Sequence, residues 1–476
     1  MKVLTAAQMR EADRQAIEAG VPGLILMENA AMRVVEFLAE RYAPLDKHHI
    51  VVCCGKGNNG GDGLAIARQL GMRFRARVEV VLACEPAELK GDAEANWRML
   101  VVAGCTVVRD LAPGATIIVD ALLGTGLEGA PRGRVAELIA AIKKLKKAHI
   151  VAVDMPSGLG FDGVRAEATV TFAAPKVEHY LSAEADRVGE LVVGAIGISA
   201  RILNSDPGHW LNVTEPHEVG ALLQPRASDG HKGTYGHALI VGGATGKSGA
   251  AAMAGLAALR AGAGLVTVAC DDSSRMAPEL MTAPLDAPPV EGKTVLAIGP
   301  GLGTEAGVAA LLKRLLDSES LRVLDADALN IVAQKGLSVA GCIVTPHPGE
   351  MSRLTGKTAA EIQNGRLEVA RDFAMSRRCT LVLKGHRTLI AFEDGTVWIN
   401  PTGNPGMATG GTGDILTGLI AGLLAQFPDR AREAVIAAVW LHGRAGDRAA
   451  EALGEQSVIA TDLLRYLPRA MADARV

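Results

Sequence analysis

The chain alternates short, mainly apolar segments with longer segments of helical periodicity. In its first part, apolar runs occupy residues 49–54, 77–84, 115–124, 149–156, 168–174 and 189–198, with helical patterns over 64–74, 92–104 and 134–147. Apolar runs without polar alternation are typical of strands buried on both faces, and the intervening helices cover those faces. The pattern therefore predicts an α/β domain with a mainly parallel sheet.

This alternation stops over residues 204–233, a segment rich in Pro, Gly, His and Asp, and then resumes. The later apolar runs are 237–243, 264–270, 293–303, 321–330, 342–350, 380–385 and 388–400, and two long helical patterns, 414–427 and 431–453, follow them. No fixed-period repeat relates the two parts. We therefore expect two different three-layer α/β domains in tandem, residues 1–213 and 222–476.

Composition and charge narrow the class of protein. The 476 residues carry 49 Lys and Arg against 52 Asp and Glu, and only 3% are aromatic, which argues against a nucleic-acid surface. The seven cysteines have no regular spacing, so we expect reduced thiols in a cytoplasmic protein. No segment reads as a signal peptide or reaches membrane-spanning length without charge or clustered glycine. Small-molecule partners and a homo-oligomer are expected.

A glycine-rich loop, GKGNNGGDG, follows the first apolar run. Gly55, Gly57 and Gly60 match the GxGxxG pattern of dinucleotide sites, yet the carboxylate of Asp62 would repel a pyrophosphate. The alternative is a glycine connector needed only for a tight turn. Segments 122–131 and 154–159 also follow apolar runs, and the carboxyl ends of parallel strands meet at one edge of a sheet. The sequence predicts a ligand site at that edge.

The segments GKGNNGGDG, VDALLGTGLEGAPRG, VDMPSGL and TFAAPK, in this order, are similar to the NAD(P)H-hydrate epimerase domain, which has a Rossmann-like parallel sheet. The resemblance covers residues 1–213. It implies that the hydrated dinucleotide is held by Asn58, Asn59, Gly60, Gly61 and Asp62, its phosphates by Gly124, Thr125, Gly126, Leu127, Glu128, Gly129 and Ala130, and its nicotinamide ring by Asp154. The implied ligands of a potassium ion (K⁺) are Asn59, Asp120 and Ser157.

This ligand set has a chemical rationale. Oxygen-only ligands suit a hard, weakly bound cation, which would also offset the carboxylate in the loop. Epimerising a carbon that bears a hydroxyl beside a ring nitrogen requires proton transfers, and a positioned carboxylate can perform them as general acid/base. We predict Asp154 for this role; the alternative is that Asp154 caps a helix or turn ahead of Pro156. Lys176 is a weaker candidate for the same role and is predicted rather to be a phosphate or surface contact.

A second glycine-rich loop, GNPGMATGGTGD, directly precedes a long helical pattern. Free amides and the positive end of a helix can hold a transferring phosphoryl group, and Asp414 can take the proton of the attacking hydroxyl. The alternative is that Asp414 only stabilises the helix terminus. The segment GGATGKSGAA is not a Walker A loop, because three residues separate Gly242 from Gly246 where four are required.

The GGTGD segment resembles the signature of ribokinase-like kinases. With GPGLG, LDADALN, TPHPGEM and LKGHRTLI it resembles the ADP-dependent NAD(P)H-hydrate dehydratase domain over residues 222–476. The implied hydrate ligands are Gly264, Gly303, His347 and Asp414, although His347 also fits a loop histidine with satisfied hydrogen bonds. The implied nucleotide ligands are Lys384, Gly385, His386, Arg387, Thr388, Asn404, Pro405, Gly406, Met407, Ala408, Thr409, Gly410, Gly411, Thr412 and Gly413. Mg²⁺ is expected on the phosphates of ADP, with Asp325, Asp327 and Glu350 as outer contacts.

Together the two resemblances imply a bifunctional NAD(P)H-hydrate repair enzyme. Its epimerase would interconvert the R and S hydrates of NADH and NADPH, and its dehydratase would consume the S form with ADP, releasing AMP and phosphate. Two alternatives stay open. A small-molecule kinase for vitamin precursors, with an accessory dinucleotide-binding domain, would share Asp414 but form a stable phosphorylated product. The N-terminal half could instead be a non-catalytic dinucleotide sensor.

Overall fold

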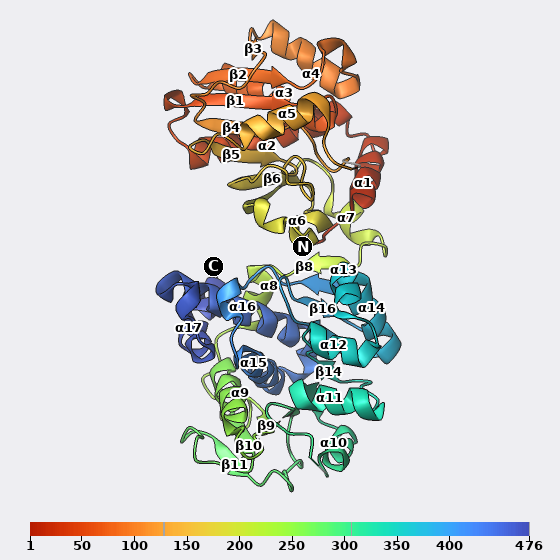
Figure 1. Cartoon of the computed structure of the whole chain (residues 1–476), viewed down its shortest axis with the longest axis vertical. Helices are drawn as coiled ribbons and strands as arrows, with labels where there is room; N and C mark the ends of the chain where they lie inside the picture. The colour runs from red at the N-terminus through yellow and green to blue at the C-terminus, as the bar shows by residue number, and fades with distance from the viewer. Residues whose placement is uncertain (127–128, 306, 476) are drawn as a thin grey trace. The chain divides into compact units, whose positions relative to one another are not determined.

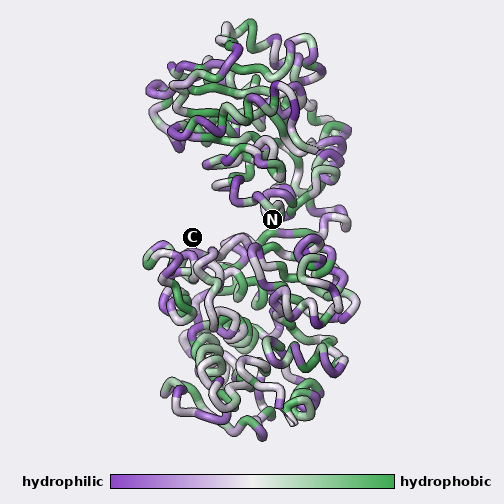
Figure 2. Tube along the Cα trace, in the orientation of Figure 1, coloured by the Kyte–Doolittle hydropathy of each residue, from purple (hydrophilic) through white to green (hydrophobic). Residues whose placement is uncertain are grey.

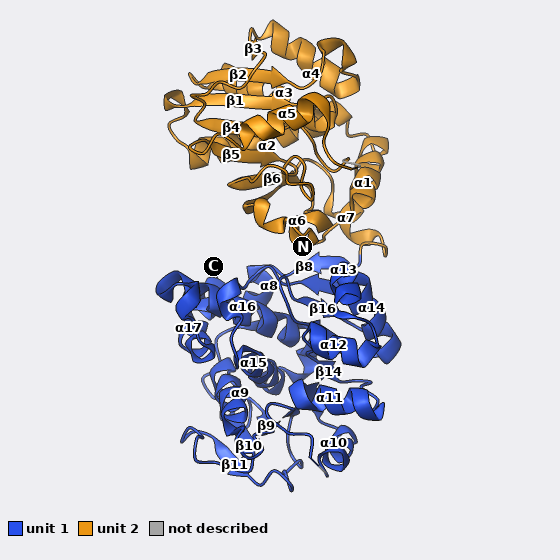
Figure 3. Cartoon of the chain, viewed as in Figure 1, with its two compact units in different colours: residues 1, 210–476 blue, residues 2–209 orange. Residues whose placement is uncertain are grey.

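The computed structural model of the chain describes residues 1–126, 129–305 and 307–475. It divides into two compact units, coloured separately in Figure 3. The N-terminal unit comprises residues 2–209, and the C-terminal unit comprises residue 1 with residues 210–476. Each unit has its own sheet and its own hydrophobic core.

In the described part of the N-terminal unit, seven parallel strands lie in the order β3-β2-β1-β4-β5-β6-β7 (Figure 1). The strands are β1 (His49–Cys54), β2 (Arg77–Leu82), β3 (Thr106–Val108), β4 (Ile117–Ala121), β5 (His149–Val153), β6 (Ala168–Phe172) and β7 (Glu190–Gly194). Every residue of β4 and β6 is buried. Because successive strand residues point to opposite faces, the sheet is covered on both faces, as the apolar runs predict.

The helices of this unit are α1 (Ala6–Glu18), α2 (Gly23–Arg41), α3 (Asn58–Arg73), α4 (Gly91–Val102), α5 (Gly133–Ile142), α6 (Val177–Leu181) and α7 (Ala200–Ser205). Helix α3 begins six residues earlier than its apolar pattern predicts, so the first glycine-rich loop supplies its first turn. Glycine is a poor helix former. Close packing requires it here, because a Cβ on Gly60 would lie 1.8 Å from the carbonyl oxygen of Gly55.

Ten strands of the C-terminal unit, counted over its described residues, lie in the order β11-β10-β9-β12-β13-β14-β15-β16-β17-β8. Only β16 runs antiparallel to its neighbours in that sheet. The strands are β8 (Leu211–Val213), β9 (His237–Val241), β10 (Leu265–Ala269), β11 (Met281–Ala283), β12 (Val295–Ile298), β13 (Leu321–Leu324), β14 (Ile343–Val344), β15 (Thr380–Leu383), β16 (Leu389–Ala391) and β17 (Val397–Ile399). Strand β8 pairs with β17, so residues 211–213 belong to this sheet although the sequence pattern grouped them with the first domain.

The helices of the C-terminal unit are α8 (Pro216–Leu222), α9 (Ser248–Ala261), α10 (Val308–Leu316), α11 (Ala326–Lys335), α12 (Pro348–Thr355), α13 (Ala359–Asn364), α14 (Arg366–Arg377), α15 (Thr412–Gln426), α16 (Ala431–Leu453) and α17 (Ala460–Asp473). Helix α15 is buried from Ile415 through Ala425 and packs on α9, β9, β12 and β13. Gly418 permits the close approach of α9, since a Cβ there would lie 2.1 Å from the Ala254 carbonyl oxygen. This packing fixes the amino end of α15 at the carboxyl edge of the strands.

Hydrophobic residues make up most of β1, β2 and β4 in the N-terminal unit (Figure 2). Over the described residues, none of the helices combines the length and the apolar character that crossing a bilayer requires. All seven cysteines are free thiols, and five of them are buried.

Candidate functional site

The N-terminal unit contains a cavity of about 630 Å³ at the carboxyl edge of its sheet. The loops after β1, β4 and β5 meet there, as predicted from their positions after apolar runs. Of the predicted hydrate and phosphate ligands, those that line the cavity are Asn58, Asn59, Asp62, Gly124, Thr125, Gly126 and Asp154. Gly60 and Gly61 lie in the buried first turn of α3, and Gly129 and Ala130 are exposed. Leu127 and Glu128 fall outside the described residues.

Asp154 follows β5 and lines the cavity with a side chain that is 15% exposed. Its backbone is left-handed, with φ of 63°, an uncommon conformation for a residue other than glycine. Burial by itself would raise the pKa of Asp154, but the Lys176 ammonium outweighs burial, so the pKa lies below its usual range. Among the described residues, no backbone N–H of the following turn donates to this carboxylate, whose hydrogen bonds come from side chains.

The expectation that Lys176 is a surface contact is wrong. The Lys176 side chain is only 2% exposed, and its Nζ lies 2.6 Å from Asp154 Oδ1. A charged group this deeply buried requires a partner, and Asp154 is that partner. The sequence alone does not distinguish a buried lysine from an exposed one, because both can follow an apolar strand.

Two further carboxyl groups line the same cavity. Asp62 is 9% exposed, and burial together with the charges of Asp154 and Asp13 raises its pKa well above the usual value. Asp13, on α1, was not predicted; burial raises its pKa to about 6. The amphipathic pattern of α1 gives no signal that separates Asp13 from charges on the solvent-facing side. The cavity therefore holds protonated and ionised carboxyl groups together.

The predicted potassium ligands lie at the same edge of the sheet. Asp120 is the penultimate residue of β4 and is fully buried, and its Oδ1 accepts a hydrogen bond from Ser157 Oγ at 2.6 Å. Burial raises the pKa of Asp120 to about 6. Both side-chain polar atoms of Asn59 are buried without a hydrogen-bond partner in the described part of the chain. Unpaired buried amides are rare in folded proteins, so Asn59 is available to a ligand.

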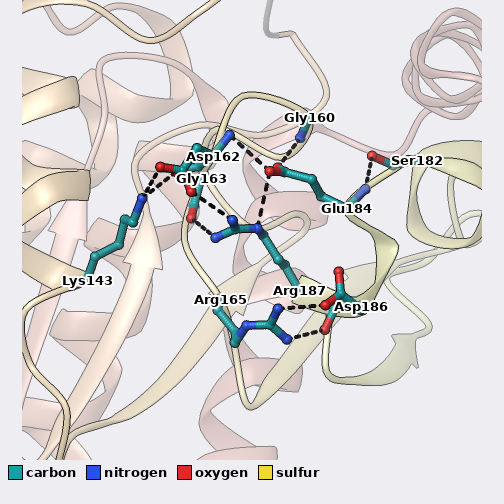
Figure 4. Close-up of polar contacts among 9 residues, drawn as sticks. All are labelled: Lys143, Gly160, Asp162, Gly163, Arg165, Ser182, Glu184, Asp186 and Arg187. Atoms are coloured by element: carbon teal, nitrogen blue, oxygen red, sulfur yellow. Dashed lines mark hydrogen bonds and ion pairs between the residues drawn. The ribbon is translucent and has the colours of Figure 1, made fainter.

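The turn that follows Ser157 is held by a polar network at the surface (Figure 4). Asp162 accepts hydrogen bonds from Lys143 Nζ at 2.6 Å and from an Arg187 guanidinium nitrogen at 2.7 Å. Glu184 accepts a hydrogen bond from the Gly160 N–H at 2.8 Å. Single exposed ion pairs contribute little, but a network of several restricts a loop. The network thereby helps to hold Ser157 against Asp120.

In the C-terminal unit, charged side chains gather where β13 and β15 end. Lys384 Nζ lies 2.7 Å from Asp325 Oδ1, and Asp325 Oδ2 accepts a hydrogen bond from Thr417 on α15 at 2.7 Å. Asp414 stands in the first turn of α15 and is partly buried. Burial, reinforced by the negative charge of Asp325, raises the pKa of Asp414 to about 6. A carboxylate with that pKa is better suited to take a proton near neutral pH than an ordinary aspartate.

The second glycine-rich loop supplies the free amides that were predicted, with one exception. Thr409 N–H donates to the Met407 carbonyl oxygen at 2.9 Å. The N–H groups of residues 410–413 donate to no acceptor among the described residues, as expected where a helix begins. Helix α16 holds this loop: His442 Nε2 lies 2.9 Å from the Thr412 carbonyl oxygen, and the Asp447 carboxylate accepts from Gly403 N–H at 3.1 Å.

The predicted nucleotide ligands lie in two segments of the C-terminal unit, one after a strand and one before a helix. Residues 384–388 follow β15, and residues 404–413 lead into α15. Asn404 is held by Asp447, since its Nδ2 lies 3.0 Å from Asp447 Oδ1. His442 and Asp447 were not predicted to contribute here, because both lie within a regular helical pattern.

The predicted hydrate ligands are not all brought together. Gly303 follows β12, and its N–H donates to Asp327 Oδ2 at 2.8 Å. His347 caps α12, where its Nδ1 accepts from Gly349 N–H at 3.0 Å, so it matches a loop histidine with satisfied hydrogen bonds at that nitrogen. Gly264 directly precedes β10 and so lies at the amino edge of the sheet, the edge opposite to Gly303 and His347.

The carboxylates expected to act as outer magnesium contacts already have protein partners. Asp325 pairs with Lys384, Asp327 accepts from Gly303 N–H, and Glu350 accepts from His347 N–H at 2.8 Å. No group of three or more His, Cys, Asp or Glu side chains among the described residues could hold a metal ion unaided. These side chains therefore fit contacts to a metal ion through water better than direct ligation.

Comparison with known proteins decides the family. The family model described as NAD(P)H-hydrate dehydratase matches residues 238–469, and the model of the YjeF-related protein N-terminus matches residues 23–178. The chain is 41% identical to the bifunctional NAD(P)H-hydrate repair enzyme Nnr of Moorella thermoacetica, over 98% of this chain and 96% of that protein. The chain belongs to the family of bifunctional NAD(P)H-hydrate repair enzymes. The family's Escherichia coli member is 35% identical over 98% of this chain and 93% of its own length.

Solved structures support the same assignment for the C-terminal unit. The ADP/ATP-dependent NAD(P)H-hydrate dehydratase of Bacillus subtilis, co-crystallised with ATP and Mg²⁺, is 35% identical, with a TM-score of 0.51 over 55% of this chain and 98% of that chain. A ribokinase-like superfamily protein of Enterococcus faecalis is 33% identical, with a TM-score of 0.51 over 56% of this chain and 96% of its own. The ribokinase-like fold predicted for the C-terminal unit of this repair-enzyme family member is thereby confirmed.

Proposed function

We propose that the chain repairs hydrated NADH and NADPH in two steps, one in each unit. The N-terminal unit interconverts the R and S hydrates, and the C-terminal unit dehydrates the S form with ADP. The observation that carries this proposal is that each unit presents an aspartate beside a glycine-rich loop at the carboxyl edge of its sheet, Asp154 in one and Asp414 in the other. Similarity to repair enzymes along both halves favours it over the vitamin-precursor kinase.

Asp154 is proposed as the general acid/base of epimerisation. A proton delivered to the ring hydroxyl lets the C–O bond break, and the ring nitrogen lone pair stabilises the resulting iminium ion. That first proton comes from solvent, and the hydroxyl departs as water. Water then adds from the opposite face, the ionised carboxylate takes one of its protons, and the carboxylate passes this proton back to solvent, so the reaction balances without any other reagent. The low pKa of Asp154 keeps its carboxylate ionised and able to receive that proton.

We propose that Asn59, Asp120 and Ser157 hold a potassium ion. The support is chemical: the buried, unpaired amide of Asn59 and the buried carboxylate of Asp120 are hard oxygen donors, and no cationic side chain pairs with Asp120 among the described residues. When bound, such an ion would supply positive charge that stabilises Asp120 and the anionic groups of the substrate.

Asp414 is proposed as the base of the dehydration. It takes the proton of the ring hydroxyl as the oxygen attacks the terminal phosphoryl group of ADP, and AMP departs. The free N–H groups of residues 410–413 stabilise the charge on the transferred group. The ring nitrogen then expels phosphate, and loss of a proton from the adjacent ring carbon restores the reduced nicotinamide. Mg²⁺ on the nucleotide would neutralise phosphate charge.

The proposal also includes the domain bounds, the site ligands, the cellular location and the oligomeric state. Two functional domains are proposed, close to the predicted residues 1–213 and 222–476 but with residues 211–213 in the C-terminal sheet. The proposed hydrate and nucleotide ligands of both sites are those predicted from the sequence except Gly264, which lies at the opposite edge of its sheet. The free state of all seven cysteines supports a cytoplasmic location. We also propose a homo-oligomer.

The experiment supplies the purified chain with an equilibrated mixture of R and S hydrates, K⁺, Mg²⁺ and either ADP or ATP. The recovery of reduced nicotinamide is followed by absorbance, and AMP, phosphate and phosphorylated products are quantified. Full recovery of the coenzyme with one AMP and one phosphate for each molecule supports the proposal. Accumulation of a stable phosphorylated product from a panel of vitamin precursors, without recovery of coenzyme, favours the kinase.

A further inference from the structure

Lys176 and His179 are buried beside Asp154, and the two proposed reaction steps give neither of them a role. Lys176 Nζ has three acceptors within hydrogen-bond distance: Asp154 Oδ1 at 2.6 Å, Thr171 Oγ1 at 2.8 Å and the Phe172 carbonyl oxygen at 3.2 Å. An ammonium group has three N–H donors, so this one is fully used within the protein. Lys176 is therefore not available to bind a phosphate of the substrate.

The two carboxylate oxygens of Asp154 are not equivalent. Oδ1 accepts from Lys176 and also from Thr171 Oγ1 at 2.9 Å. Oδ2 accepts no hydrogen bond from any described residue, and it lies 3.4 Å from where a Cβ on Gly124 would stand. Gly124 lines the cavity, so Oδ2 is the oxygen next to the proposed substrate loop.

His179 connects the backbones of the two charged residues. Its Nδ1 accepts the Lys176 backbone N–H at 2.9 Å, so the ring proton lies on Nε2, which donates to the Asp154 carbonyl oxygen at 2.8 Å. Burial lowers the pKa of His179 to about 4, which keeps the ring neutral. The ring spans the left-handed backbone of Asp154 and the start of α6, so both ends of the ion pair are held in place.

We infer that Lys176 and His179 are positioning residues of the epimerase step. Lys176 occupies Oδ1 of Asp154 and leaves Oδ2 as the oxygen that exchanges a proton with the substrate hydroxyl. His179 fixes the backbone that aims this carboxylate at the cavity. The inference rests on the proposed epimerase function of the N-terminal unit.

Removing Lys176 changes the charges that act on Asp154. The charged and titratable groups near Asp154 are Lys176 and His179 after β6, Asp62 on α3 and Asp13 on α1. Without the ammonium, burial and the two remaining carboxyl groups all favour the protonated form of Asp154. The acidic limb of the pH profile for epimerisation must then move to higher pH.

The test uses the full-length chain and the variant Lys176→Met. Interconversion of the epimers is measured across pH as kcat/KM, and dehydration of the S hydrate by the C-terminal unit serves as the control in the same molecule. We expect epimerisation to fall about 10²- to 10⁴-fold, with its acidic limb at higher pH and dehydration unchanged. The inference is overturned if Lys176→Met interconverts the epimers at the wild-type rate and the acidic limb of its pH profile has not moved. Absence of epimerisation in the wild-type chain overturns the proposed function instead.

Three further variants keep the inference testable if Lys176→Met fails to fold, since breaking a buried ion pair is strongly destabilising. In Lys176→Ala, added ethylamine or propylamine can enter the vacated space, and we expect partial rescue of kcat. His179→Gln retains one acceptor and one donor, so it should keep more activity than His179→Ala. Failure of every amine to raise the rate in a folded Lys176→Ala chain, or equal rates for the two His179 variants, contradicts the inference.

Discussion

Lys384 and Asp325 form an ion pair across the ends of β15 and β13, with Nζ and Oδ1 2.7 Å apart. Burial is the main cause that raises the pKa of Asp414; the negative charge of Asp325 raises it further, and the positive charge of Lys384 lowers it. The Lys384–Asp325 pair therefore influences the protonation of Asp414, the proposed base, through its charges and without a hydrogen bond to it. Thr417 fixes the other oxygen of Asp325, so the arrangement is tied to α15 itself.

The dehydratase reaction should lose rate below about pH 6. Asp414 must be ionised to accept a proton, and its pKa is raised to about 6, so kcat/KM should fall tenfold for each pH unit below that value. Replacing Asp325 by Asn removes a negative neighbour of Asp414, which lowers its pKa. The acidic limb of Asp325→Asn should therefore lie at lower pH than in the wild type. A limb that stays in place would show that another group titrates.

Helix α16 should control nucleotide affinity through Asp447. In Asp447→Asn one of the two hydrogen bonds to Gly403 and Asn404 is lost, and an unpaired buried polar group costs about 1–3 kcal/mol. We expect the KM for ADP to rise roughly 5- to 100-fold, with a smaller change in kcat. The matched control is Glu451→Gln on the same helix, whose ion pair with Arg448 is exposed. Equal KM values for the two variants would contradict this role.

Asp62 should make the N-terminal unit less stable as pH rises. Its folded-state pKa is raised well above the unfolded value, so the folded chain binds the proton more tightly. Stability is therefore lost between the unfolded and the folded pKa, by at most about 1.4 kcal/mol per pH unit. Asp62→Asn should unfold at a higher temperature than wild type at pH 8 and differ little at pH 4. Asp46→Asn, at an exposed site, is the control.

Epimerisation should depend on potassium through Asn59. The wild-type rate is measured while K⁺ is replaced by Li⁺ or by an organic cation, at constant ionic strength. We expect a saturable rise with K⁺, and Asn59→Leu should abolish that rise because it removes the unpaired amide oxygen. A wild-type rate independent of K⁺ would contradict the proposed ion site, and dehydration by the same chain provides the control for general salt effects.

Much of the fold followed from the sequence, because strands such as β4 are apolar at each position except Asp120 and are separated by amphipathic helices. Strands β3, β8 and β11 were not predicted, because each has three residues and none lies within a longer apolar run. The start of α3 was placed too late because glycines do not signal a helix, whereas packing against Gly55 requires them.

For the sites, Asp154 could be predicted because a motif coincides with the end of a strand, and Asp414 because a glycine-rich loop directly precedes a helix. Residues that act from regular helices could not. Asp13 on α1 and His442 on α16 have the spacing of ordinary helical residues, and only the tertiary structure brings them to a cavity or a loop. The burial of Lys176 also depends on contacts that no local pattern encodes.

The most direct test of two-step repair starts from the pure R hydrate, with ADP, Mg²⁺ and K⁺, and follows the recovery of reduced nicotinamide. The wild-type chain should convert all of it. Asp154→Ala should leave the R hydrate unconverted beyond its spontaneous epimerisation, while still consuming pure S hydrate at the wild-type rate. Consumption of the R hydrate by Asp154→Ala as fast as by the wild type would contradict the account.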